Sequence, residues 1–188
     1  MKEEAPMATS RAAKTAKAIR QPTAKSAQPS ARRTGATRAG TKVAPMDDYE
    51  GVRQVLSRYC FALDSGQLDL LGPLFHREAS FSVSFEAGTT HTGRTEIQAW
   101  YEQLFSQRAD QVRCMRHKIY EPQLSISGTQ ASSVVYFDAD SLQADGSVRV
   151  VAGRYDDTLV KERGRWFFKD RTITVLYNYT PGKGQEGM

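Results

Sequence analysis

The sequence has 188 residues, a formal net charge of +5 and 39% hydrophobic residues, which fits one domain with or without a tail. No apolar run approaches the roughly 18 residues that a membrane-spanning helix needs, and no signal-peptide core is visible. The two cysteines, Cys60 and Cys114, are too few for a disulfide framework. We therefore expect a cytoplasmic protein without a membrane span.

The first 45 residues differ in composition from the rest. They hold ten Lys and Arg against Glu3 and Glu4, a net +8 that leaves −3 for the remaining residues. Low hydrophobicity and like charge predict that these residues form a disordered basic tail. A second interpretation is that the start codon is assigned too far upstream and that the true start is Met46. An organellar transit peptide is an alternative. Contact with nucleic acid or an anionic surface is possible but less favoured, because no aromatic residue is interleaved to stack on bases.

The pattern changes after Pro45, where a first helix is predicted. Asp47 followed by Glu50 resembles a capping box, and Gly66 is a stop signal. Between them, apolar residues recur at helical spacing: Val52, Val55, Leu56, Tyr59, Cys60 and Leu63. Cys60 is expected to be a buried free thiol on this face.

Two further helices and a strand follow. Residues 68–75 predict a short second helix, and residues 95–107 a third, amphipathic one. Between them, Phe81, Val83 and Phe85 alternate with serines, which is typical of a half-buried strand.

The second half of the chain predicts long antiparallel strands. Pro122 marks a bulge or an edge position, and Asp145-Gly146 is the strongest hairpin signal. The expected strands are 112–127, 130–142, 147–162 and 165–178. Helices followed by a meander of antiparallel strands predict an α+β fold, with the helices on one face of a curved sheet. The predicted domain spans residues 46–180, with a flexible C-terminus at 181–188.

The sequence offers no common cofactor motif. His and Cys residues form no pair at metal-ligand spacing, and phosphate-binding glycine loops and the GxSxG elbow are absent. We expect neither a metal nor a cofactor. Acid–base chemistry remains, with His117 on a predicted strand and Asp64 at the end of the first helix. A carboxylate on one imidazole nitrogen lets the other take a proton, and the phenol of Tyr59 could assist.

Several short motifs occur in a characteristic order: Arg58-Tyr59, Leu63-Asp64, Gly93-Arg94-Thr95-Glu96-Ile97, Arg116-His117, Gly153-Arg154-Tyr155-Asp156-Asp157 and Gly164-Arg165-Trp166. Over residues 47–179 they resemble the SnoaL-like group of the nuclear transport factor 2-like superfamily, which includes scytalone dehydratase and bile acid dehydratase. The resemblance implies a cone-shaped α+β roll. In such a roll, a curved mixed or antiparallel sheet is wrapped by three helices from the N-terminal half around one apolar pocket.

The resemblance also implies site residues. In dehydratase-like relatives a strand His pairs with an Asp at the end of the first helix, and His117 and Asp64 match these positions. Tyr59 matches a Tyr about one turn before the Asp. His117 is then the expected general base, oriented by Asp64, with Tyr59 stabilising an oxyanion or assisting a leaving group.

Five more residues are candidate substrate contacts. Tyr120 stands where relatives often have Asn. Asp138 and Asp140 are candidates for a further acid or base, of which we expect one to face the pocket. Arg154 is a candidate anion-binding residue or, as often for a strand Arg, part of a surface salt bridge. Trp100 completes the set.

Together these features predict a cofactor-independent lyase (dehydratase-like) or isomerase. Its substrate would be small and apolar or cyclic, such as a steroid, polyketide, terpenoid or aromatic intermediate. The alternative is a non-catalytic binding or structural subunit of the same fold, like the β subunits of ring-hydroxylating dioxygenases. A homodimer or homotrimer is expected, because the sheet should expose an apolar face formed by Val134, Tyr136, Val150, Ile173 and Val175.

Overall fold

The structure is a computed structural model that describes residues 47–182 and 184–185. Its helical elements are α1 (Asp48–Asp64), α2 (Leu68–Leu71), the 3-10 turn η1 (Gly72–Leu74) and α3 (Arg94–Arg108). Its strands are β1 (Phe75–Val83), β2 (His91–Thr92), β3 (Val112–Ile119), β4 (Gln123–Ser127), β5 (Gln130–Gln143), β6 (Val148–Glu162), β7 (Arg165–Thr180) and β8 (Gly184–Gln185). The tail predicted at residues 1–45 lies outside the described residues. The C-terminal segment 181–188 is described only in part, so its predicted flexibility stays a prediction.

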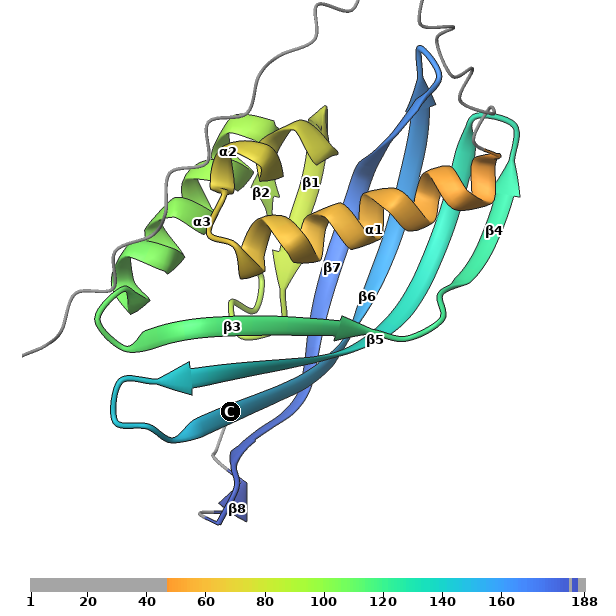
Figure 1. The fold of residues 1–188 in the computed structure, drawn as a ribbon. Coiled ribbons are helices and arrows are strands. Elements are labelled where there is room, and N and C mark those ends of the chain that lie inside the picture. The colour runs from red at the N-terminus through yellow and green to blue at the C-terminus, as the bar shows by residue number, and fades with distance from the viewer. Residues whose placement is uncertain (1–46, 183, 186–188) are drawn as a thin grey trace, which may run out of the picture. The chain divides into compact units, whose positions relative to one another are not determined.

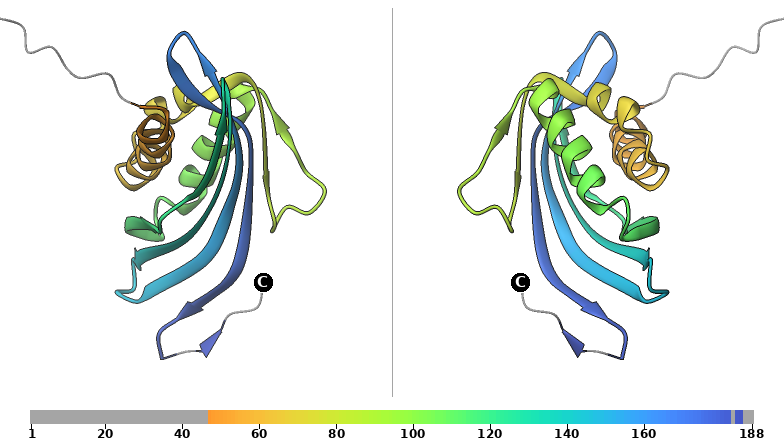
Figure 2. Two further views of the ribbon diagram at one scale, coloured as in Figure 1. Left: turned by 90° about the vertical axis from the view of Figure 1, so that its right-hand side faces the viewer. Right: turned by 90° about the vertical axis from the view of Figure 1, so that its left-hand side faces the viewer.

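One mixed sheet organises the described residues. Its strand order is β2-β1-β7-β6-β5-β3, with β4 also paired to β5 and β8 to β7. The β1–β7 pair is parallel, and every other pair is antiparallel. The sheet is strongly curved, and α1 and α3 lie on its concave side (Figures 1 and 2). This arrangement confirms the predicted α+β roll.

Helix α1 begins and ends where the sequence indicates. The Asp47 side chain accepts a hydrogen bond from the backbone N–H of Glu50 at 2.8 Å, which caps the first turn. Gly66 has a φ of 66°, a left-handed conformation that glycine adopts without strain. All six residues of the predicted apolar face are buried. The last residue of the helix, Asp64, is thereby held at a fixed place beside the sheet.

Three elements differ from the prediction in their boundaries. The second helix ends at Leu71, and the chain passes through η1, with Pro73 near its start, straight into β1. Strand β1 therefore begins at Phe75, well before the predicted strand. A register shift between Phe75 and Ser80 interrupts the alternation of buried and exposed residues, which hides this part of the strand in the sequence. Similarly, the strand predicted at 112–127 is divided into β3 and β4, because Pro122 lies in the break.

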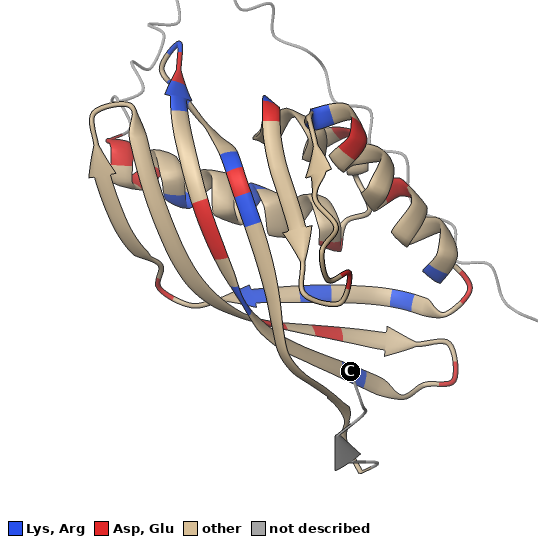
Figure 3. Ribbon diagram, turned by 180° about the vertical axis from the view of Figure 1, so that it is seen from behind, with Lys and Arg blue, Asp and Glu red and all other residues tan. Residues whose placement is uncertain are grey.

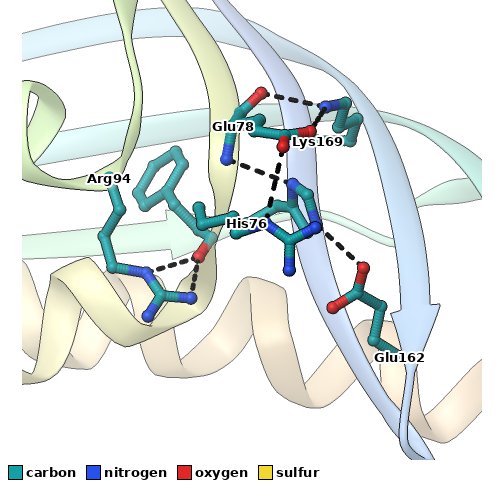
Figure 4. Close-up of polar contacts among 7 residues, drawn as sticks. His76, Glu78, Arg94, Glu162 and Lys169 are labelled. Atoms are coloured by element: carbon teal, nitrogen blue, oxygen red, sulfur yellow. Dashed lines mark hydrogen bonds and ion pairs between the residues drawn. The ribbon is translucent and has the colours of Figure 1, made fainter.

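Side-chain contacts hold the irregular start of β1 (Figure 4). The backbone N–H of Glu78 donates to His76 Nδ1 at 3.2 Å, so Nε2 carries the proton in the neutral ring and donates to Glu162 at 2.9 Å. Arg94 of α3 donates to the carbonyl of Phe75 through Nε at 2.9 Å and Nη2 at 2.6 Å. These contacts join β1 to α3 and to β6 where the regular ladder is broken.

No helix in the described part of the chain is both long and apolar enough to cross a membrane.

Candidate active site

A cavity of about 590 Å³ lies on the helix-covered side of the sheet. Its wall is formed by α1, α3 and strands β1, β3, β5, β6 and β7, and includes the apolar side chains of Leu63, Trp100, Leu104, Phe137, Val151 and Ile173. The volume and the largely apolar wall are typical of sites for small molecules.

Asp64 and His117 lie together on the wall of this cavity. Asp64 Oδ1 is 2.6 Å from His117 Nδ1, and Asp64 Oδ2 accepts from the backbone N–H of His117 at 2.8 Å. The carboxylate thus holds both the ring and the strand that carries it. With the Nδ1 proton donated to Asp64, the neutral ring has its lone pair on Nε2, which can accept a proton.

The pair depends on two elements far apart in sequence. Asp64 is the final residue of α1, and His117 is on β3 opposite Ala139 of β5. Ala139 also lines the cavity.

Tyr59 lines the same cavity and is hydrogen-bonded to a second tyrosine. Its hydroxyl oxygen is 2.6 Å from that of Tyr101, and both side chains are buried. Burial raises the pKa of Tyr59 to about 12. Burial, and then the proximity of Tyr59, also raise the pKa of Tyr101 well above its usual value. Both phenols therefore keep their protons near neutral pH and can donate hydrogen bonds.

A buried ion pair contacts the ring of Tyr59. Arg171 and Asp157 are fully buried and joined by two hydrogen bonds, 2.7 Å from Nε and 2.8 Å from Nη2. The guanidinium carbon lies 3.9 Å from the ring centre of Tyr59 and 4.4 Å from that of Tyr155. Cation–π contact and charge pairing together fix the position of the Tyr59 ring.

Of the five predicted substrate contacts, Trp100 alone lines the cavity. Its Nε1–H donates to the carboxylate of Glu86 at 3.0 Å. Arg154 instead forms a surface salt bridge, with Nε 2.9 Å from Asp156, which is the second of the two roles expected for it. Tyr120 is exposed outside the cavity.

The expectation that Asp138 or Asp140 faces the pocket is wrong. Residues two apart on a strand share a face, and Ala139 between them is the one that lines the cavity. Asp138 accepts a hydrogen bond from Tyr120 at 2.7 Å. Asp140 pairs with Arg116 and Lys118. Both carboxylates thus lie on the outer face of the sheet, away from His117.

Tyr101 is not among the residues predicted for the site. It lies on the apolar face of α3, where a tyrosine is most simply read as core packing. Only the fold brings its hydroxyl to that of Tyr59. Among the described residues, no group of three or more His, Cys, Asp or Glu side chains is placed to hold a metal ion.

The residues expected to form an apolar outer face divide between two environments. Tyr136 is exposed, and Val134 and Val150 are half-buried. Ile173 and Val175 instead line the cavity, because they are opposite Tyr155 and Gly153, which belong to the inner row of β6.

Several solved structures share this fold. A candidate scytalone dehydratase from Novosphingobium aromaticivorans is 20% identical, with a TM-score of 0.62 over 70% of this chain and 85% of its own. Hexachlorocyclohexane dehydrochlorinase LinA-type3 from Novosphingobium barchaimii is 13% identical, with a TM-score of 0.62 over 74% and 94%. A candidate aromatic ring hydroxylase from Novosphingobium aromaticivorans is 20% identical, with a TM-score of 0.62 over 77% and 96%. At these identities the likeness shows the fold.

Among curated proteins, no sequence matches significantly. The model of the SnoaL-like domain matches residues 44–172, which is more than half of the chain and contains α1, α3 and the Asp64–His117 pair. The chain therefore belongs to the SnoaL-like domain family.

Proposed function

We propose that this protein is a cofactor-independent lyase of the dehydratase type, or an isomerase. Its substrate would be a small apolar or cyclic molecule, such as a steroid, polyketide, terpenoid or aromatic intermediate. The observation that carries the proposal is the Asp64–His117 pair on the wall of an apolar cavity. An oriented imidazole in a site of low polarity is suited to proton abstraction from carbon.

His117 is the general base in this proposal. Its Nε2 takes a proton from a carbon next to an activating group, and Asp64 stabilises the imidazolium that forms. In a lyase the leaving group then departs from the neighbouring carbon. In an isomerase the proton returns to a different carbon. Positioned acid–base catalysis of this kind contributes about 10²–10⁴-fold to rates.

Tyr59 and Tyr101 supply hydrogen bonds to the reacting molecule. One hydroxyl donates to the other, so the remaining proton can be directed to a developing oxyanion or to a leaving-group oxygen. Such donors are effective where water is excluded and their positions are fixed in advance. The Arg171–Asp157 pair, whose guanidinium packs on the Tyr59 ring, holds the Tyr59 hydroxyl in position.

The solved structures support the reaction class at the level of the fold. Two of those described above have names that denote eliminations, a dehydratase and a dehydrochlorinase. A third name, an aromatic ring hydroxylase, relates to the alternative reading as a non-catalytic subunit of an oxygenase. The oriented dyad favours the lyase or isomerase.

The test begins with a ligand screen. Purified protein is scanned for thermal stabilisation by steroid, phenolic and polyketide intermediates, because a ligand of the native state raises the melting temperature by mass action. Each stabilising compound is then incubated with protein in deuterated water, and carbon-bound deuterium and elimination products are followed by NMR. We expect exchange or elimination with the native protein and little with His117→Gln. Ligands that bind without any exchange or elimination would support the non-catalytic alternative instead.

A further inference from the structure

Asn178 lies on strand β7, where an irregularity of the strand turns its side chain toward the cavity. Asn178 lines the cavity and is 7% exposed, whereas its neighbour Tyr177 is 44% exposed. Regular alternation from Val175, which also lines the cavity, would instead place Tyr177 inside and Asn178 outside. The register of β7 against β6 shifts between Val175 and Tyr177, and such bulges redirect side chains, often beside active sites.

A neighbouring arginine orients the amide group of Asn178. Arg149 Nη2 donates to Asn178 Oδ1 at 3.3 Å. An arginine side chain has donors only, so it is the amide oxygen that faces Arg149. The amide nitrogen carries two protons and makes no hydrogen bond with any residue in the described part of the chain. That nitrogen is not enclosed, so it can donate into the cavity.

Strand register places Asn178 in one row with His117. The row crosses four adjacent strands, and all its members line the cavity: His117 on β3, Ala139 on β5, Val151 on β6 and Asn178 on β7. Polar groups thus stand at the two ends of the row, with two apolar side chains between them. Strands are spaced ~4.8 Å apart, so three spacings separate the ends by about 14 Å along the sheet. The side-chain tips are closer than this, because the cavity lies on the concave side (Figures 1 and 2).

The row favours a ligand with an apolar body and an oxygen at its far end. A molecule that contacts both His117 and Asn178 must extend across β5 and β6, which suits fused rings better than a single small ring. The cavity volume of about 590 Å³ is in the range of sites for ligands of this size. An apolar group placed against the Asn178 amide would leave a donor without an acceptor, which disfavours binding.

We propose that Asn178 is a specificity-determining residue. Its amide N–H donates a hydrogen bond to an oxygen at the end of the substrate remote from the carbon that His117 deprotonates. The substrate class is then a fused-ring molecule with a carbonyl or hydroxyl group at this remote end. The inference rests on the proposed function for the place of the reacting carbon. The recognition of the remote oxygen can be measured without turnover.

Two steroids that differ by one remote oxygen provide the test. Androst-4-ene-3,17-dione and androst-4-en-3-one share the unsaturated ketone of the first ring, and only the dione has an acceptor at the opposite end. Their dissociation constants for the full chain are measured by equilibrium dialysis with detection by mass spectrometry. We expect the native protein to prefer the dione about fivefold, as for one hydrogen bond between neutral groups.

Two variants of Asn178 should abolish the preference for the dione. Asn178→Leu removes the amide and keeps a similar volume. Asn178→Asp keeps the shape and an acceptor for Arg149, but its carboxylate has no proton to donate. The second variant retains the test if the first does not fold, which circular dichroism checks.

Matched variants separate the effect of Asn178 from general effects. Gln111→Leu removes an amide that lines the same cavity outside this row, and should keep the preference for the dione. His117→Gln should also keep it, so a failure of catalysis and a failure of remote-oxygen recognition are distinguishable. The inference is overturned if neither steroid binds saturably, if the native protein binds both equally, if folded Asn178 variants keep the preference, or if Gln111→Leu also loses it.

Discussion

At the scale of single residues, the proposed chemistry depends on which nitrogen of His117 faces the cavity. Asp64 accepts from both the ring and the backbone of His117, so the backbone bond fixes the carboxylate, and rotation of the ring would break the Nδ1 bond to it. Such a contact fixes the tautomer as well as the position. The roles of Asp64 and His117 are thus interdependent.

Variants of the dyad test this interdependence. His117→Gln removes the base, and Asp64→Asn keeps the shape but favours the wrong tautomer. Each should lower turnover by about 10²-fold or more, and the double variant should be little worse than either single one. Turnover is measured with a ligand identified by the thermal screen, and circular dichroism checks the fold. Additive losses, or near-normal turnover by folded His117→Gln, would refute the assignment.

The tyrosine pair gives a prediction for alkaline pH. The pKa of Tyr59 is raised from 10.0 to about 12, so the folded state resists ionisation of this phenol more than the unfolded state does. The associated stabilisation is present below pH 10 and is lost as the pH rises toward about 12. When tyrosine ionisation is followed by ultraviolet absorbance, Tyr59→Phe should reduce the absorbance change at the highest pH, where the last phenols ionise. Loss of amplitude near pH 10 would show that the Tyr59 hydroxyl is in contact with water.

At the scale of elements, periodicity and turn residues predict most of the fold. The first helix, the third helix and the hairpin at Asp145-Gly146 are within one or two residues of the prediction. Their signals are local, since capping, helical spacing and glycine turns each depend on a few neighbouring residues. The first part of β1 is missed because its bulge breaks the alternation. Such irregularity is set by tertiary contacts like those of His76 and Arg94.

The same distinction holds for the site. The sequence and the family resemblance predict His117, Asp64 and Tyr59 as site residues, and the structure brings the three to one cavity. Neither points to Tyr101, because its contact with the Tyr59 hydroxyl depends on how α3 is placed beside α1. Asp138 was misassigned for a simpler reason: the face of a strand follows from its alternation, and Ala139 occupies the inward position.

The cap of α1 is a testable link between an element and the site. Asp47→Ala removes the hydrogen bond to Glu50 N–H and should lower the free energy of unfolding by about 1 kcal/mol. Asp47→Asn keeps an acceptor and should cost only a few tenths of that amount. Urea unfolding followed by circular dichroism measures both. Equal destabilisation by the two substitutions would mean that charge, rather than the hydrogen bond, stabilises the first turn.

At the scale of the whole molecule, the two faces of the sheet have different roles. The inner face supplies the cavity. The outer face, seen in Figure 3, carries charges of both signs separated by uncharged stretches. Among its side chains are Tyr120, Tyr136 and Tyr177, which are 56%, 52% and 44% exposed. In the sheet, Tyr177 is opposite Ala152, which is opposite Asp138, the acceptor of the Tyr120 hydroxyl. Three exposed tyrosines therefore belong to one region.

This region is where we expect self-association. Exposed aromatic side chains on a sheet favour burial in a symmetric interface, so light scattering at micromolar concentration should give the mass of a homodimer or homotrimer. Tyr136→Lys should shift the mass toward that of a monomer, because a lysine pair related by symmetry would be buried without a partner. Phe61→Lys is the control: Phe61 is 74% exposed but lies on α1, away from the outer face of the sheet. A monomeric native protein would contradict the expected assembly, and a normal oligomer of Tyr136→Lys would place the interface elsewhere.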